Sequence, residues 1–105
     1  MINHLISDNK AIIEKICKDF QVNQMYVFGS ITTKEFNENS DIDFLISFSN
    51  ALSIDDYTEN YFALHQKLED IFNRNIDLLT DNSLSNPYFI DSINQSKQLI
   101  YESKN

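Results

Sequence analysis

The stretch Val27–Phe44, VFGSITTKEFNENSDIDF, constrains this chain more than any other part of it. It contains the only glycine of the protein, Gly29, directly after the β-prone run Gln24–Phe28. A residue without a Cβ atom can adopt a positive φ angle and lets a ligand approach the backbone closely. The stretch ends in a second apolar run that carries Asp41 and Asp43. We therefore predict two strands, the first of which ends in a turn at Gly29.

The spacing of apolar residues predicts the remaining elements. The expected strands are Gln24–Phe28, Asp41–Phe48 and Asn75–Thr80, and residues 98–102 form a short extended tail. The expected helices run from a cap at Ser7 or Asp8 to about Phe20, from about Asp56 to Asn73, and onward from Pro87 with Ser85 or Asn86 as the cap. Residues 1–7 form a lead-in, and residues 30–35 form one or two helical turns with Ser30 as the N-cap. Helices that alternate with strands predict an α/β or α+β domain with a small sheet flanked by helices.

Composition excludes several classes of protein. The 105 residues predict one domain, 1–105, and 42% hydrophobic residues can form a core. No apolar run reaches ~18 residues, so no membrane span is expected, and the N-terminus lacks the features of a signal peptide. The single cysteine, Cys17, is expected to be packed in the core, which fits a reducing cytoplasm. A net charge of −8 with scattered lysines and arginines argues against direct nucleic-acid binding.

Three aspartates occupy strand positions where carboxylates are rare. Side chains alternate along a strand, so Asp41 and Asp43 point to one face with Cα atoms ~6.5–7 Å apart. Asp77 lies between Ile76 and Leu78 and can join the pair if the two strands are neighbours. Carboxylates held together repel one another or recruit a cation, and an all-oxygen set favours Mg²⁺ or Mn²⁺ over zinc. The alternative is that the aspartates simply face solvent.

Gly29 and Ser30 form a candidate phosphate-holding turn. Ser30 offers a backbone N–H and a hydroxyl, and a helical turn after it would add the positive end of its dipole. The alternative is an ordinary glycine at a strand end, followed by a serine helix cap. The chain has no other glycine, so its other turns form without one.

Together these residues resemble a known family. Phe28-Gly29-Ser30, ten intervening residues and then Asp41-Ile42-Asp43 are similar to the GS-x10-D-x-D motif of the polymerase-β-like nucleotidyltransferases. The run Asn75–Leu79, NIDLL, resembles the strand that carries their third carboxylate. With its short length, the chain is similar to the minimal nucleotidyltransferase (MNT) group over about residues 20 to 102.

The resemblance implies a fold and an activity. The fold would be a mixed sheet flanked by helices. Gly29 and Ser30 would hold the β- and γ-phosphates of ATP, and Asp41, Asp43 and Asp77 would be catalytic and bind two Mg²⁺ ions. Members of the minimal group commonly act as antitoxins of HEPN-domain RNase toxins, which they inactivate by AMPylation of a toxin tyrosine. The resemblance therefore implies a cytoplasmic nucleotidyltransferase with a HEPN toxin as its partner.

The chain departs from the family pattern directly after Ser30. Many relatives carry a small residue, an arginine and a glycine there, where this chain has Ile31–Lys34. Lys34 or Arg74 would have to supply the missing phosphate contact, and otherwise each is a solvated surface charge. The altered loop also keeps a second function open, an antitoxin that neutralises its toxin by contact with a vestigial nucleotide site. Transfer to a small molecule is a third hypothesis, weakened by the lack of a second domain to hold that substrate.

Overall fold

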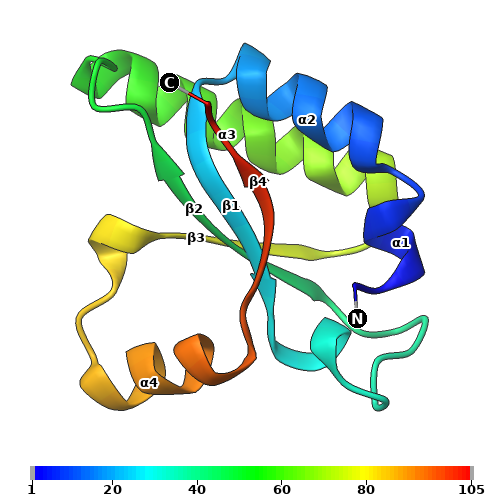
Figure 1. Ribbon diagram of the computed structural model, residues 1–105. Coiled ribbons are helices and arrows are strands. Elements are labelled where there is room, and N and C mark those ends of the chain that lie inside the picture. Colours follow the sequence, from blue (N-terminus) through cyan, green and yellow to red (C-terminus); the bar gives the residue numbers. More distant parts are fainter. Residues whose placement is uncertain (1, 105) are drawn as a thin grey trace.

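One four-stranded sheet forms the centre of the computed structural model, which describes residues 2–104 (Figure 1). The strands are β1 (Val22–Phe28), β2 (Ile42–Phe48), β3 (Ile76–Thr80) and β4 (Gln98–Glu102), in the order β3-β2-β1-β4. β1 pairs antiparallel with both β2 and β4, whereas β2 pairs parallel with β3. The sheet is therefore mixed, which confirms the fold implied by the resemblance. The outermost residues of the expected domain, 1 and 105, lie outside the described residues.

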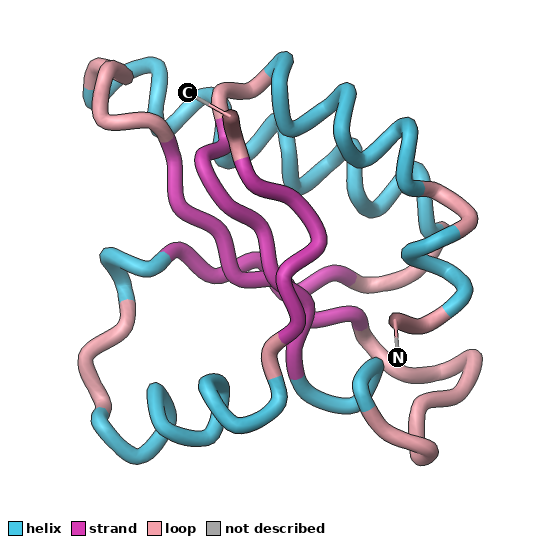
Figure 2. The backbone as a smooth tube through the Cα atoms, in the orientation of Figure 1, coloured by secondary structure: helices cyan, strands magenta, loops and turns pink. Residues whose placement is uncertain are grey.

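The helices are divided between the two faces of the sheet. They are α1 (His4–Ser7), α2 (Lys10–Asp19), α3 (Ile54–Phe72) and α4 (Pro87–Ser96), with 3-10 turns η1 (Gly29–Thr32) and η2 (Asp81–Ser83). Figures 1 and 2 show α2 and α3 together on one side of the strands and α4 apart from them. Between residues 2 and 104, no helix is long and apolar enough to cross a bilayer.

Alternation along β2 explains this arrangement. Four alternate side chains of β2 join α2 and α3 in the main core; they are Ile42, Phe44, Ile46 and Phe48. The residues between them point to the opposite face of the sheet, where Leu45 packs in a smaller cluster with Phe28 and with Ile93 of α4. The sheet thus has one face under a continuous apolar layer and one face under a single short helix.

Local capping signals fix two of the helices. The hydroxyl of Ser53 accepts a hydrogen bond from the backbone N–H of Asp56, so α3 begins at Ile54, two residues earlier than expected. Asn73 ends α3 in a left-handed conformation. Asn86 caps α4, with Pro87 in its first turn, which confirms one of the two caps expected there.

Two expected caps are wrong. The side chain of Asn3 caps α1 within the expected lead-in, and Asp8 ends that helix, so α2 starts after Asn9 rather than after Ser7 or Asp8. Ser30 lies inside η1 and does not cap it, because the positive φ of Gly29 starts the turn one residue earlier. The extended tail at residues 98–102 is confirmed as β4.

Candidate functional site

Asp43 and Asp77 lie side by side on neighbouring parallel strands. Asp43 in β2 is paired in register with Asp77 in β3, so the adjacency that the sequence left open is confirmed. The flanking residues of each are buried in the main core, and alternation therefore directs both carboxylates to the face that carries α4. Asp41 directly precedes β2 and is exposed, as is Asp77.

The half-buried Asp43 has an unusual protonation behaviour. Burial and, after it, the negative charges of Asp77 and Asp41 together raise the pKa of Asp43 to about 6. Burial disfavours the charged form, and like charges add to that effect. The three predicted carboxylates are thus near enough to act on one another electrostatically.

Gly29 brings the turn against this carboxylate. It has a φ angle of +74° and follows Phe28, which is paired with Asp43. A Cβ atom at Gly29 would collide with Oδ2 of Asp43. Two independent features therefore require a glycine at this position: the backbone conformation and the close approach of the Asp43 side chain.

Hydrogen bonds hold the Gly29 turn in place. The backbone N–H of Gly29 donates to Oγ of Ser96, the last residue of α4, at 3.2 Å. The hydroxyl of Thr32 donates to the carbonyl oxygen of Gly29 at 2.7 Å. The N–H and the hydroxyl of Thr33 both donate to the carbonyl oxygen of Ser30. Sequence reasoning missed Ser96, because no local pattern connects it to a turn that lies 67 residues away.

The two cations considered for phosphate contact have different positions. Lys34 is exposed beyond the end of η1. Arg74 is half-buried, and its guanidinium carbon lies 4.8 Å from the centre of the Phe36 ring. Its Nη1 donates to the carbonyl oxygens of Asn37 at 3.0 Å and Ser40 at 2.8 Å. The interpretation of Arg74 as a solvated surface charge is therefore wrong, because it fixes the loop that leads into Asp41.

Comparison with known proteins decides the family. The family described as Polymerase beta, Nucleotidyltransferase matches residues 10–105. The chain belongs to this family. Among related nucleotidyltransferases is MJ0126 of Methanocaldococcus jannaschii, described as a candidate protein adenylyltransferase. It is 35% identical over 100 residues, which cover 91% of this chain and 96% of MJ0126.

Solved structures share the nucleotidyltransferase fold. A chain from a toxin–antitoxin crystal structure with AMP-PNP has a TM-score of 0.69 at 22% identity, covering 91% of this chain and 75% of that one. A chain from a complex of tri-AMPylated Shewanella oneidensis HEPN toxin with its MNT antitoxin has a TM-score of 0.64 at 20% identity, covering 94% and 74%. At such identities the likeness concerns the fold alone, which agrees with the nucleotidyltransferase family to which the chain belongs.

The donor set of this nucleotidyltransferase fits a hard cation chemically. Asp41, Asp43 and Asp77 offer only oxygen atoms, which suits Mg²⁺. A bound cation would favour the charged form of Asp43, whose pKa is raised by burial and by the neighbouring carboxylates. Between residues 2 and 104, however, no three His, Cys, Asp or Glu side chains stand close enough together to hold an ion without moving. The carboxylates would therefore need to move closer together to coordinate one.

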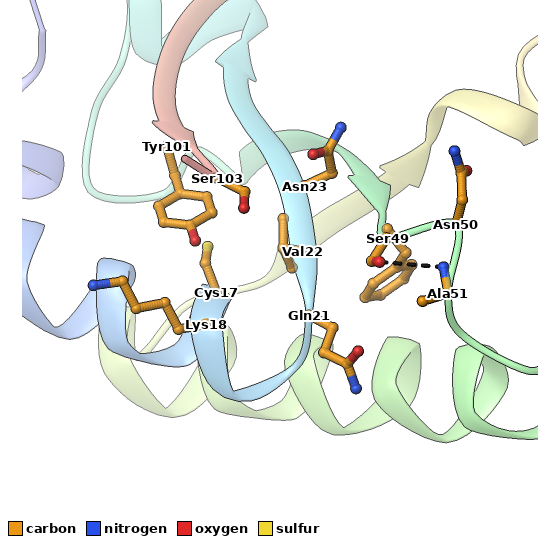
Figure 3. Close-up of a pocket in the computed structure, with 11 residues that line it drawn as sticks. Cys17, Lys18, Gln21, Val22, Asn23, Ser49, Asn50, Ala51, Tyr101 and Ser103 are labelled. Atoms are coloured by element: carbon orange, nitrogen blue, oxygen red, sulfur yellow. Dashed lines mark hydrogen bonds between the residues drawn. The ribbon is translucent and has the colours of Figure 1, made fainter. Parts of the chain in front are cut away.

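A separate pocket of about 460 Å³ lies at the other end of β1, and none of the predicted site residues lines it (Figure 3). Cys17, Lys18, Asn23 and Tyr101 are among the residues that surround it. Cys17 is fully buried, and burial raises the pKa of its thiol to about 12. The thiol thus stays protonated, which confirms that this cysteine is a packed group rather than a nucleophile.

Proposed function

We propose that this protein is a Mg²⁺-dependent adenylyltransferase and an antitoxin that transfers AMP from ATP to a tyrosine hydroxyl of a HEPN-domain RNase toxin. The observation that carries the proposal is the register of Asp43 with Asp77, with Asp43 packed against the Gly29 turn. The description of MJ0126 as a candidate protein adenylyltransferase supports the reaction class. The AMP-PNP and tri-AMPylated toxin complexes support the nucleotide and the partner.

Charge explains why this site would need cations. A triphosphate cannot approach three carboxylates in a protein of net charge −8 unless positive charge lies between them. In the proposal Asp41, Asp43 and Asp77 hold two Mg²⁺ ions, which when bound would neutralise the phosphate oxygens and stabilise the leaving group. The backbone of Gly29 and Ser30 would hold the β- and γ-phosphates, with Lys34 near the end of the turn.

The proposed reaction is an in-line transfer. A toxin tyrosine oxygen forms a bond to the α-phosphorus of ATP. The bond between that phosphorus and the oxygen that bridges the α- and β-phosphates breaks, and pyrophosphate leaves. Asp77 accepts the tyrosine proton, because it lies exposed at the edge strand where a partner can reach it. Asp43, which is half-buried, is the more protected of the two paired carboxylates.

Incubation of the toxin with ATP, Mg²⁺ and this protein tests the proposal. Intact-mass spectrometry is expected to show one or more AMP groups on the toxin, and Asp41→Asn with Asp43→Asn is expected to abolish them. Asp70→Asn, which removes an exposed carboxylate from α3, is the matched control and is expected to retain transfer. Absence of AMP from the toxin in the presence of the wild-type protein would refute the enzymatic function.

A specific observation favours the second candidate, an antitoxin that acts by contact alone. The N–H of Gly29, which a phosphate would use, already donates to Ser96. The loop after Ser30 also lacks the arginine of many relatives. This function would be established instead if the wild-type protein and the Asp41→Asn/Asp43→Asn variant inhibit the toxin RNase to the same extent and the toxin carries no AMP.

A further inference from the structure

β3, the strand that carries Asp77, lies at the edge of the sheet. The backbone N–H of Ile42 in β2 donates to the carbonyl oxygen of Asn75, just before β3. Hydrogen-bonding direction alternates along a strand, so the carbonyl groups of Ile76 and Leu78 point away from β2 toward the open edge. These two carbonyl groups belong to the residues on either side of Asp77.

Two side chains of α3 bind these two carbonyl groups. The hydroxyl of Tyr61 donates to the carbonyl oxygen of Leu78 at 2.6 Å. Nε2 of His65 lies 2.8 Å from the carbonyl oxygen of Ile76, and because a carbonyl oxygen only accepts, this nitrogen carries the proton. The two rings are stacked one helical turn apart, with centroids separated by 6.4 Å and planes inclined by 15°.

We propose that Tyr61 and His65 are positioning residues that hold the β3 backbone on both sides of Asp77, so that its carboxylate stays in register with that of Asp43. The inference rests on the proposed function, since it concerns the third carboxylate of that site. Two like-charged carboxylates on neighbouring strands repel each other, and only one side of β3 is held by the sheet. The two hydrogen bonds from α3 resist this repulsion from the open side.

The environment of Tyr61 agrees with this arrangement. Tyr61 and His65 are both half-buried, and Tyr61 also packs against the main core. Burial raises the pKa of Tyr61, and the charge of Asp77 raises it further. The tyrosine hydroxyl therefore remains a hydrogen-bond donor near this carboxylate at neutral pH.

A purely structural role is the competing explanation, because side chains that cover an edge strand also prevent its pairing with other chains. The two explanations differ in one measurable property, the affinity of the carboxylate site for a divalent cation. A covering role affects stability and association only. A positioning role also affects Mn²⁺ binding, since groups that orient metal ligands typically change metal affinity by about 10–100-fold.

A titration of the protein alone with Mn²⁺ tests the inference. Electron paramagnetic resonance measures the concentration of the free ion and so the affinity of the protein for it. Tyr61→Phe, which removes one oxygen atom, is expected to weaken Mn²⁺ binding about tenfold. His65→Leu is expected to have a similar effect, and His65→Gln, which retains an N–H donor, is expected to recover most of the loss. Tyr57→Phe removes a hydroxyl from the same helix, where the ring packs against Phe48, and serves as the matched control.

Activity adds a second readout. In the AMP-transfer assay Tyr61→Phe is expected to lower kcat about tenfold with KM for ATP within about twofold of wild type, because the nucleotide contacts are unchanged. The inference would be overturned if Asp77→Asn weakens Mn²⁺ binding but Tyr61→Phe and His65→Leu both keep the wild-type affinity. Failure of the wild-type protein to bind Mn²⁺ would overturn it as well. If these variants bind Mn²⁺ more weakly but the wild-type protein transfers no AMP, the inference is supported and the proposed function is refuted.

Discussion

The two faces of the sheet use the same strand for different purposes. On the face covered by α2 and α3, β2 contributes Ile42, Phe44 and Ile46, which are almost completely buried. On the face that carries α4, the alternate residues are Asp43 and Leu45, and only Leu45 joins an apolar cluster. One face therefore provides most of the hydrophobic stabilisation, and the other keeps room for charged groups.

This difference shows how a small domain tolerates a charged site. A carboxylate at half-buried Asp43 is unfavourable, as its raised pKa shows. The continuous core on the opposite face offsets that cost without placing any atom in the site. We therefore expect variants on the face covered by α2 and α3 to lower mainly the free energy of unfolding. Variants on the face that carries α4 are expected to affect stability less and activity more.

The largest expected effect comes from a matched pair of substitutions in β2. Ile46→Ala on the covered face and Leu45→Ala on the α4 face delete the same number of carbon atoms. We expect Ile46→Ala, at a site 1% exposed, to lower the free energy of unfolding by about 4 kcal/mol, and Leu45→Ala, at 7%, by about 2 kcal/mol. Urea denaturation measures both, and equal losses would show that the two faces contribute alike.

The substitution Gly29→Ala is expected to have the next largest effect. The positive φ angle and the collision with Asp43 are expected to lower the free energy of unfolding by about 1–3 kcal/mol. Displacement of the turn is expected to reduce AMP transfer about a hundredfold. Addition of Asp43→Ala should recover part of the stability, because it removes the colliding carboxylate, but none of the activity. A double variant no more stable than Gly29→Ala would assign the whole loss to the φ angle.

Arg74→Lys distinguishes the two cations near the site. Loss of the planar group over Phe36 and of its bonds to the loop carbonyls is expected to cost about 1–2 kcal/mol of stability and to lower kcat. Lys34→Gln is expected to leave stability unchanged and to raise KM for ATP. Thermal unfolding and initial rates measure these effects. A raised KM in Arg74→Lys with unchanged stability would reverse the two assignments.

The smallest expected effect is a gain of stability in Asp43→Asn that depends on pH. The pKa of Asp43 is raised in the folded state, so the unfavourable contribution of its charge is absent below about pH 4 and complete above about pH 6. The half-exposed side chain is screened by solvent, so we expect a gain of about 1 kcal/mol at pH 8 and none at pH 4. Urea denaturation in EDTA measures it, and an equal difference at both pH values would contradict this origin.

Local sequence signals predicted most of the elements and part of the site. A mostly apolar, β-prone run predicts the strand Asp41–Phe48 without reference to any partner strand, and the observed β2 is one residue shorter. The cap at Asn86 and the turn at Gly29 also depend on residues a few positions apart. The ten-residue spacing to Asp41 then indicated a family, and the family supplied the mixed sheet.

The remaining features depend on contacts between distant segments. Arg74, Ser96 and the pair Tyr61 and His65 act on backbone groups of other elements, and nothing in their own neighbourhoods distinguishes them from surface residues or core residues. Strand direction decides which backbone groups they meet, and an apolar run does not encode direction. The metal and phosphate roles of the predicted residues stay predictions.

The position of β1 has a consequence for the order of folding. Its residue Met25 pairs with Ile46 on one side and with Tyr101 on the other. The first pairing closes a short loop and can form early, whereas the second spans most of the chain and carries a larger entropic cost. Ser96 reaches Gly29 only when β4 and α4 are in place. During synthesis, the Gly29 turn would thus be completed among the last steps, so a partly made chain would lack the complete candidate site.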